Sequence, residues 1–204
     1  MVFFFKQKTA YEMVRSDWSS DVCSSDLQLR LLVVGGSLGA QVLNTVVPEA
    51  LALIAPEARP RVTHQAGTAH HSAVRDRYQA CGVNATILPF IDDMAGRYAE
   101  TDLIVCRAGA TTVAEIAAAG IASVLVPYPH SVDDHQTINA RFLADRGAAL
   151  LIPQSELTAQ GLAEVLSRFT RERLLAMAQS ARAAGRPEAT RAVAQVCMEL
   201  AGAE

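Results

Sequence analysis

The chain has 204 residues, a hydrophobic fraction of 50% and a formal net charge of −3, a composition that suits one globular domain of moderate size. The near-neutral charge argues against non-specific nucleic-acid binding, and no apolar run approaches the roughly 20 residues needed to cross a bilayer. The 4 cysteines lie far apart without a Cys-x-x-Cys pair, which indicates a reducing compartment, with the cytoplasm as default, and neither a disulfide framework nor a zinc site.

Residues 1–27 differ in composition from the Ala/Val/Leu-rich chain that follows them. They hold five of the eleven aromatic residues, and Lys6, Lys8 and Glu12 interrupt the apolar start, which excludes a secretory signal. Back-translation of KQKTAYE and DWSSDVCSSDL gives two strings that resemble the flanks of a sequencing-library adapter. A natural disordered leader does not explain both strings. We therefore expect 1–27 to be translated adapter, not native and without packed structure, and the native protein to extend further upstream.

From Leu29 onward, short apolar runs alternate with segments of helical period. Runs such as Leu31–Val34 and Leu103–Cys106 are continuously apolar, as in parallel strands that are buried on both faces. The predicted strands are 30–34, 61–66, 85–89, 102–106, 122–126 and 148–152. This alternation predicts an α/β domain over 28–204, a doubly wound, Rossmann-like parallel sheet with helices on both faces, for which the common strand order is 3-2-1-4-5-6.

The last part of the chain, residues 158–203, is predicted to be a helical tail. Leu162, Val165, Leu166 and Phe169 recur at helical spacing, and Gly185-Arg186-Pro187 breaks the pattern. We expect two or three helices that pack against the sheet or reach a partner domain absent from this chain.

The first glycine turn, Gly35-Gly36-Ser37-Leu38-Gly39-Ala40, follows the first predicted strand and opens a helix. Free N–H groups and the helix dipole at such a start favour an anion, for example a diphosphate. The dinucleotide fingerprint is absent, because its first glycine would fall on Val34 and no acid ends the second strand at 65–67, so NAD is not expected. The alternative interpretation is a tight strand–helix turn without a ligand.

A second glycine turn, Arg107-Ala108-Gly109-Ala110-Thr111-Thr112, follows the fourth strand. Strands 1 and 4 are neighbours in the predicted order, so both glycine turns would flank one crevice where ligands bind. Thr112-Val113-Ala114-Glu115 matches a capping box, in which Glu115 would only bond the backbone N–H of Thr112. A carboxylate at this place is equally suited to the two hydroxyls of a ribose. Both interpretations of Glu115 stay open.

A polar segment, 127–139, leads from the fifth strand into a helix. We expect this helix to present Ile138 and Phe142 to the core. Gln136 and Asn139 stand three residues apart on one helical face, and their amides are suited to reading sugar hydroxyls.

The same segment carries side chains of the kind that bind metals: His130, Asp133, Asp134 and His135. The two aspartates fit equally well as acids at a helix start, where they complement the dipole, so no metal site is expected. The other histidines, His64, His70 and His71, lack ligand-like spacing and are predicted to lie on the solvated surface.

Together these segments resemble a known family. GGSLGA, FIDDM at 90–94, RAGATTVAEIAAAG and PHSVDDHQTINA, in this order, resemble the C-terminal domain of the MurG family of glycosyltransferase family 28, over about residues 29–202. The resemblance implies half of a two-domain GT-B fold. In the family this half binds UDP-N-acetylglucosamine (UDP-GlcNAc), and the N-terminal half binds a membrane-anchored acceptor and supplies the presumed catalytic base.

The resemblance also implies roles for residues at matching positions. Ser37 would contact the diphosphate, and the backbone of Ile91 would read the uracil. Glu115 would hold the ribose hydroxyls and Gln136 the sugar. Ala110, Thr111 and Thr112 would offer N–H and hydroxyl donors to the phosphates, and Val113 and Ala114 would belong to the same UDP-GlcNAc site. Further candidates for the site are Gly36, Gly109, His135 and Asn139.

The function implied is inverting transfer of GlcNAc from UDP-GlcNAc to the lipid-linked muramoyl-pentapeptide (lipid I to lipid II) in peptidoglycan synthesis, without cofactor or metal. The intact protein would be peripheral on the cytoplasmic face of the inner membrane. Because the N-terminal acceptor domain is missing, we expect no catalytic residue in this chain and no activity from it alone. The alternatives are a non-catalytic UDP-GlcNAc-binding module that needs a partner chain, and an isomerase like the UDP-GlcNAc 2-epimerases, which would need acid/base carboxylates in the crevice.

Overall fold

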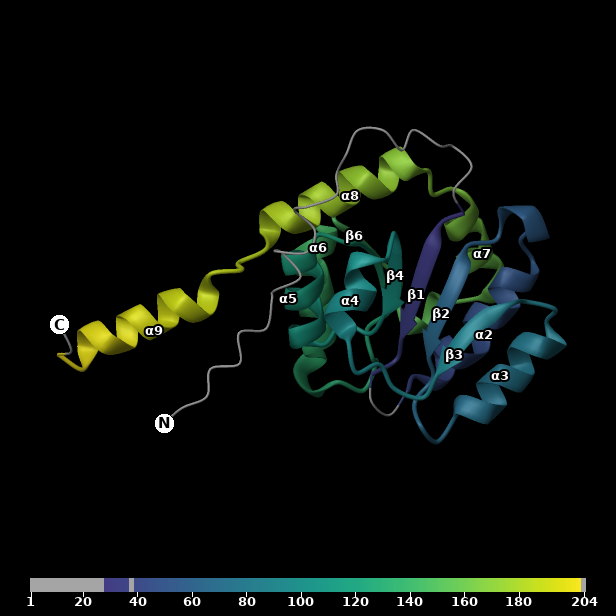
Figure 1. Cartoon of the computed structure of the whole chain (residues 1–204), viewed down its shortest axis with the longest axis horizontal. Helices are drawn as coiled ribbons and strands as arrows, with labels where there is room; N and C mark the ends of the chain where they lie inside the picture. Colours follow the sequence, from purple (N-terminus) through teal and green to yellow (C-terminus); the bar gives the residue numbers. More distant parts are fainter. Residues whose placement is uncertain (1–27, 37–38, 203–204) are drawn as a thin grey trace.

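The computed structural model describes residues 28–36 and 39–202, and these form one parallel six-stranded sheet with the order β3-β2-β1-β4-β5-β6 (Figure 1). The strands are β1 (Arg30–Val34), β2 (Arg61–Gln65), β3 (Ala85–Leu88), β4 (Leu103–Cys106), β5 (Ala122–Leu125) and β6 (Ala149–Leu151). The predicted strands and their order are confirmed. Residues 1–27 and Ser37 lie outside the described residues, so the adapter origin and the role of Ser37 stay predictions.

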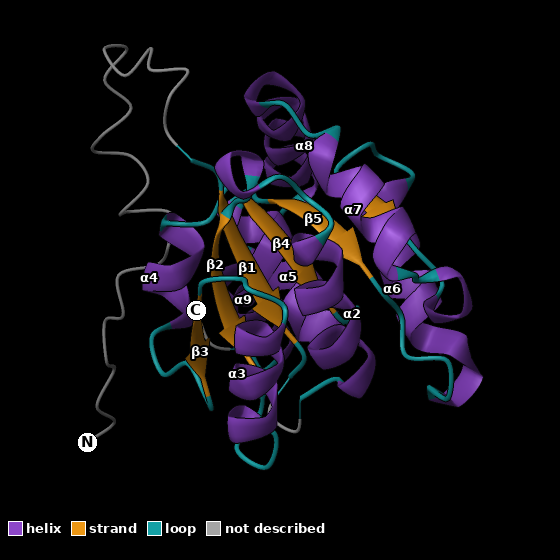
Figure 2. Cartoon of the chain, turned by 90° about the vertical axis from the view of Figure 1, so that its right-hand side faces the viewer, coloured by secondary structure: helices purple, strands orange, loops and turns teal. Residues whose placement is uncertain are grey.

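Helices connect the strands and cover both faces of the sheet (Figure 2). They are α2 (Gln41–Ala52), α3 (His71–Ala80), α4 (Met94–Ala99), α5 (Ala110–Ala119), α6 (His135–Ala144), α7 (Ala159–Ser167), α8 (Arg171–Ala184) and α9 (Ala189–Leu200). The doubly wound α/β fold predicted from the alternating pattern is therefore confirmed.

Each face of the sheet carries its own apolar cluster. On one face Leu43 and Val47 of α2 are fully buried in a cluster that also takes in α3 and α7. On the other face Ile116 of α5 and Leu143 of α6 pack against β4 and β5, whose residues are all buried. Successive side chains of a strand point to opposite faces, so strands placed between two helical layers must be apolar throughout. This rigid centre fixes the carboxyl ends of β1 and β4 side by side.

The prediction for the buried face of α6 is wrong. Ile138 is 64% and Phe142 is 40% exposed, whereas Ala140 and Leu143 are buried. Both faces of this helix carry apolar residues, so periodicity alone does not choose between them. The choice follows from Asn139, whose Nδ2 donates to the carbonyl of Ala108 at 3.1 Å and turns its own face, shared with Ala140 and Leu143, toward the sheet.

The helical tail forms as predicted, with three helices and the break at 185–187 between α8 and α9. Thr158 and Thr170 cap α7 and α8 through hydrogen bonds from the backbone N–H groups of residues 161 and 173. Both helices bury apolar residues against the domain, but α9 extends away from it and has no buried residue (Figure 1). Among the described residues, none of the helices is long and apolar enough to span a membrane.

Candidate functional site: a cavity between two glycine turns

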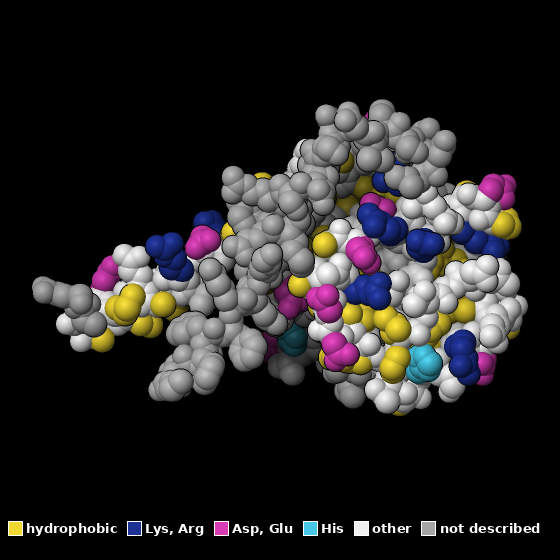
Figure 3. Space-filling view, in the orientation of Figure 1, with side chains coloured by type: hydrophobic (Ala, Val, Ile, Leu, Met, Phe, Trp, Pro, Cys, Tyr) yellow, Lys and Arg dark blue, Asp and Glu magenta, His cyan; other side chains and the backbone are white. Residues whose placement is uncertain are grey.

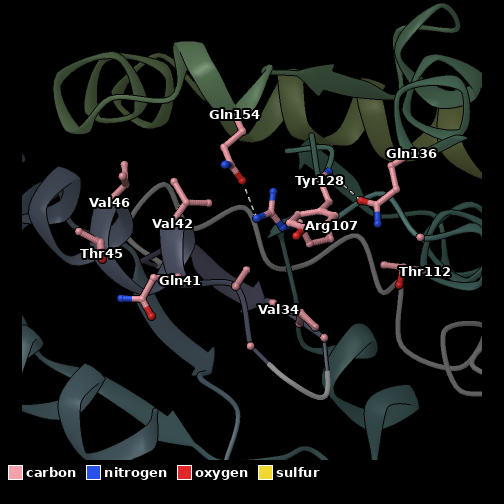
Figure 4. Close-up of a pocket in the computed structure, with 15 residues that line it drawn as sticks. Val34, Gln41, Val42, Thr45, Val46, Arg107, Thr112, Tyr128, Gln136 and Gln154 are labelled. Carbon is pink, nitrogen blue, oxygen red and sulfur yellow. Dashed lines mark hydrogen bonds between the residues drawn. The ribbon is translucent and has the colours of Figure 1, made fainter. Parts of the chain in front are cut away.

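A cavity of about 750 Å³ lies at the carboxyl ends of β1 and β4 (Figure 4). The prediction that the two glycine turns flank one crevice is confirmed, because both contribute to its wall. The lining residues are Val34, Gly35, Gly36, Gly39, Ala40, Gln41, Val42, Thr45, Val46, Arg107, Gly109, Thr112, Tyr128, Gln136 and Gln154. Four of the predicted site residues are thus in the wall: Gly36, Gly109, Thr112 and Gln136.

The first glycine turn is shaped by close backbone contacts. A Cβ atom on Gly35 would lie 2.3 Å from the backbone N of Ala40, and one on Gly39 would lie 2.2 Å from the carbonyl O of Ala66. Gly39 also has a φ of +75°, a conformation that favours glycine. Gln65 adds a side-chain contact, since its Nε2 donates to the carbonyl of Gly36 at 3.1 Å. Only glycine fits at these positions, so α2 can begin immediately beside the end of β1.

A buried polar network supports this turn from below. Asn44 Nδ2 donates to the carbonyl of Ala66 at 3.1 Å, and His64 lies between Asn44 Oδ1 at 3.0 Å and the Tyr78 hydroxyl at 2.9 Å. His64 is completely buried, so the predicted surface position is wrong for it; His70 and His71 are partly exposed. The cause is the central place of β2, which is covered at this point by both α2 and α3. Burial lowers the pKa of His64 to about 4 and keeps its imidazole neutral.

The second glycine turn leads directly into α5, whose first residue is Ala110. Gly109 is the N-cap and provides no side-chain hydrogen bond, and the first turn of α5 contains no acid. The N–H groups of Ala110, Thr111 and Thr112 therefore lack helical acceptors and lie at the positive end of the helix dipole. Because Thr112 is already the third residue of the helix, the capping-box interpretation of Glu115 is wrong.

Glu115 instead bonds to the neighbouring helix, where its Oε2 accepts a hydrogen bond from the Tyr98 hydroxyl at 2.9 Å. Burial and the Glu115 carboxylate both raise the pKa of Tyr98, so the phenol stays protonated and donates. The side chains of Ile91 and Val113 are buried in the same cluster as Tyr98, which leaves only their backbone for a ligand. Ile91, Val113, Ala114 and Glu115 do not line the cavity, nor do the exposed Ala110 and Thr111.

Gln136 and Asn139 hold the second turn in place. Gln136 Oε1 accepts hydrogen bonds from the backbone N–H of Tyr128 at 2.9 Å and of Ala108 at 3.3 Å, while Asn139 donates to the carbonyl of Ala108. Gln136 still borders the cavity, and its Nε2 makes no hydrogen bond to described residues (Figure 4). Asn139 does not border the cavity, and exposed His135 begins α6 outside it.

The aspartates of this loop adopt a backbone conformation that is unusual for residues other than glycine. Asp133 and Asp134 have φ values of 50° and 53°, and the Asp134 carboxylate accepts a hydrogen bond from the Thr137 hydroxyl at 2.6 Å. Within residues 28–36 and 39–202, no three His, Cys, Asp or Glu side chains are grouped so as to hold a metal ion.

The sequence analysis missed Arg107 and Gln154 as wall residues. The Arg107 guanidinium donates to the carbonyls of Val126 and Pro127 at 3.1 Å and to Gln154 Oε1 at 2.7 Å, and it lies 5.3 Å from the centre of the Tyr128 ring (Figure 4). Burial lowers its pKa while Tyr128 opposes this shift, and a guanidinium stays charged at neutral pH. Arg107 is thus the one cation among the described residues that line the cavity. The only local signal was the position of Arg107 directly before the glycine turn.

Comparison with known proteins gives the family. The model of the glycosyltransferase family 28 C-terminal domain matches residues 30–196. The chain belongs to this family.

A protein of Aromatoleum aromaticum named UDP-N-acetylglucosamine–N-acetylmuramyl-(pentapeptide) pyrophosphoryl-undecaprenol N-acetylglucosamine transferase is 63% identical over 173 residues, covering 85% of this chain and 48% of that protein. A protein of the same name from Nitrosospira multiformis is 56% identical over 172 residues, 84% of this chain and 48% of its own length. The chain spans about half the length of these curated relatives.

Solved structures agree with the family assignment. The crystal structure of Acinetobacter baumannii MurG matches with a TM-score of 0.81 and 43% identity, over 86% of this chain and 53% of that one. The resemblance to the MurG family predicted from the four segments is confirmed. A UDP-GlcNAc 2-epimerase from Neisseria meningitidis matches with a TM-score of 0.56 and 12% identity, over 85% of this chain and 45% of its own, and shares the fold alone.

Proposed function

We propose that this chain is the donor-binding half of an inverting transferase that moves GlcNAc from UDP-GlcNAc to a lipid-linked muramoyl-pentapeptide. The observation that carries the proposal is the meeting of two helix N-termini without acids, those of α2 and α5, at one cavity between two glycine turns. Such ends attract anions through free N–H groups and dipoles, and a sugar nucleotide carries its negative charge on a diphosphate. The names of the relatives supply the identity of the sugar and acceptor.

In this proposal the diphosphate lies between the two helix starts. The Thr112 hydroxyl and Ser37 donate to its oxygens, and the Arg107 charge lies within the cavity. The N–H groups of Ala110 and Thr111, at the start of α5 beside the cavity wall, donate as well. The Nε2 group of Gln136 remains for a sugar hydroxyl. Glu115, beside α4, accepts from the ribose hydroxyls, and the backbone at Ile91 reads the uracil edge.

Transfer with inversion needs an acceptor oxygen that attacks the anomeric carbon from the side opposite UDP, while a base takes the hydroxyl proton. The helix starts would stabilise the charge that develops on the departing phosphate, a contribution that is usually large in such reactions. Among the described residues that line the cavity, none is a carboxylate or a histidine. We therefore propose that the base and the acceptor site belong to the other half of the full-length protein, which would act at the cytoplasmic face of the inner membrane.

The same absence of carboxylates from the described wall disfavours the epimerase alternative, whose chemistry needs a proton acid and base at the sugar. A donor-binding module that needs a partner chain is compatible with the proposal. For this chain alone, we expect binding without transfer.

Calorimetric titration with UDP-GlcNAc tests the donor site. We expect saturable binding that weakens about tenfold in Thr112→Val, which removes a hydroxyl that can bond a charged phosphate. Thr190→Val, on α9 away from the cavity, is the matched control and should bind like the parent chain. No binding of UDP-GlcNAc, or equal binding of ADP-glucose, would contradict the proposal.

A transfer assay tests the division of labour. UDP release is followed with UDP-GlcNAc and a lipid-linked muramoyl acceptor, first with this chain and then after addition of a separately expressed N-terminal half of the Aromatoleum relative. We expect turnover only in the second case. Acceptor-dependent turnover by this chain alone would show that the catalytic base lies in this chain and would contradict the proposal.

A further inference from the structure

A second cavity, of about 340 Å³, lies at the opposite edge of the sheet, where β1 and β2 begin. Its lining residues are Arg30, Leu31, Leu32, Arg61, Thr63, Thr86, Arg97, Glu100 and Thr101. Arg30 and Arg61 are register partners on β1 and β2, and Thr63 and Thr86 are register partners one step further along β2 and β3. Arg97 and Glu100 come from the end of α4. Three guanidiniums and the hydroxyls of Thr63 and Thr86 therefore border the cavity, whereas the Thr101 hydroxyl already donates to the carbonyl of Arg97 at 2.7 Å.

The acids near this cavity do not balance its cations. Glu100 lies 3.3 Å from Arg97, and Asp102 is shared between Arg30 and Arg171, each at 3.8 Å. Asp102 also accepts the backbone N–H of Arg30 at 2.7 Å. Among the described residues, the three guanidiniums of the wall thus face two carboxylates, one of which is shared with Arg171. In Figure 3 basic side chains, with acidic ones among them, lie on the viewer's face of the molecule, near α4 and above the place where Figure 1 labels β1 and β2.

Arg61 contributes most to this excess of positive charge. Its guanidinium makes no hydrogen bond or ion pair with any described residue, and it is exposed beside Arg30 on the neighbouring strand. Like charges at directly paired positions of a sheet destabilise it. An anion between the two arginines would remove that repulsion.

We infer that this cavity, referred to below as the arginine pocket, binds a phosphate group. The forked N–H groups of arginine match the oxygens of phosphate in pairs, and threonine hydroxyls complete such sites as further donors. The volume is enough for a phosphate with a small attached group. Because the arginine pocket lies at the amino ends of the strands and the donor cavity at their carboxyl ends, one ligand does not displace the other.

Nuclear magnetic resonance on the full chain tests this inference, with inorganic phosphate as the probe and no UDP present, because the phosphates of UDP would compete for the arginine pocket. We expect saturable shifts of the backbone amides of Thr63, Thr86 and Thr101. Arg61→Gln and, separately, Arg97→Gln should each weaken this binding by about tenfold or more, the usual effect of losing a hydrogen bond between charged groups. Arg75→Gln removes an exposed arginine from α3 and should leave the affinity for phosphate unchanged. Unshifted amides, or equal affinity in all three variants, would overturn the inference.

Vesicles distinguish the two sources of a phosphate group. The chain is sedimented with vesicles of phosphatidylglycerol and of phosphatidylcholine. Binding to phosphatidylglycerol that is lost in Arg61→Gln identifies the ligand as a lipid headgroup. Phosphate binding in solution without any vesicle binding identifies it as a soluble phosphate compound. Vesicle binding that Arg61→Gln does not change, together with unshifted amides, counts against the arginine pocket.

Discussion

The two glycine turns that meet at the cavity at the carboxyl ends of β1 and β4 are held in different ways. The β1–α2 turn is fixed by backbone packing, because Gly35 and Gly39 approach other backbone atoms more closely than any side chain allows. The β4–α5 turn has room for a Cβ at Gly109, whose nearest neighbour would be the Thr112 hydroxyl at 3.8 Å, and is tethered by side chains of α6. The first turn depends mainly on the absence of side chains, with Gln65 as a further tether, and the second depends on the amides of Gln136 and Asn139. Mutations should separate these two modes.

The largest effect is expected at Gly39. In Gly39→Ala the new Cβ meets the carbonyl of Ala66 and the backbone keeps a positive φ, so we expect a loss of more than roughly 3 kcal/mol in unfolding free energy together with loss of UDP binding. Gly82→Ala is the control, since Gly82 also has a positive φ but open space around it, and should cost roughly 1 kcal/mol. Unfolding free energies are measured by urea denaturation. Equal losses in Gly39→Ala and Gly82→Ala would show that the close approach of Gly39 to the carbonyl of Ala66 does not shape the turn.

The network below the first turn makes its stability depend on pH. The pKa of His64 is about 4 in the folded chain against an ordinary 6.5, so the unfolded state takes up a proton first as the pH falls. The full contribution of neutral His64 to the unfolding free energy is therefore present above about pH 6.5. This contribution, about 3 kcal/mol, is lost as the pH falls from 6.5 to 4. Urea denaturation at several pH values measures this slope. His64→Gln should flatten it, and an unchanged slope in that variant would assign it to other groups.

Glu115 lies just beyond the second turn. Glu115→Gln keeps an acceptor for the Tyr98 hydroxyl, so stability should change little, but the proposed charged bonds to ribose are weakened. We expect UDP affinity to fall by roughly 1.5 to 3 kcal/mol, measured by calorimetry. Glu164→Gln, at an exposed position of α7, is the matched control. An unchanged affinity for UDP in Glu115→Gln would show that Glu115 does not bind the ribose hydroxyls.

The smallest effect is expected at the tether of the second turn. Asn139→Ala removes the hydrogen bond to Ala108 and should cost about 1 kcal/mol in unfolding free energy, with a few-fold loss of UDP affinity as the turn loosens. Asn84→Ala, an exposed asparagine, should be neutral in both measurements. A larger loss at Asn139 than at Gly39 would reverse the comparison between the two turns.

The same comparison explains what the sequence could predict. Strands such as Leu103–Cys106 and both glycine turns leave local patterns, so the sheet, its order and the single crevice followed from spacing. The tethers did not, because Gln65 reaches Gly36 and Gln154 reaches Arg107 across long stretches of chain. The predicted surface position of His64 was wrong for a related reason. Its burial depends on Asn44 and Tyr78, which the fold brings to β2 from two separate helices.

The pairing of β1 with β4 has a consequence for how the chain folds. Leu31 pairs with Leu103, so the two glycine turns are brought together only after the two strand–helix units that lie between them in the sequence have been made. Contacts of such large sequence separation form late and slowly, since the loop entropy must be lost before the contacts are gained. A chain emerging from the ribosome would carry the first turn long before it had anything to bind. UDP should therefore accelerate none of the early steps of folding and should slow unfolding of the finished domain.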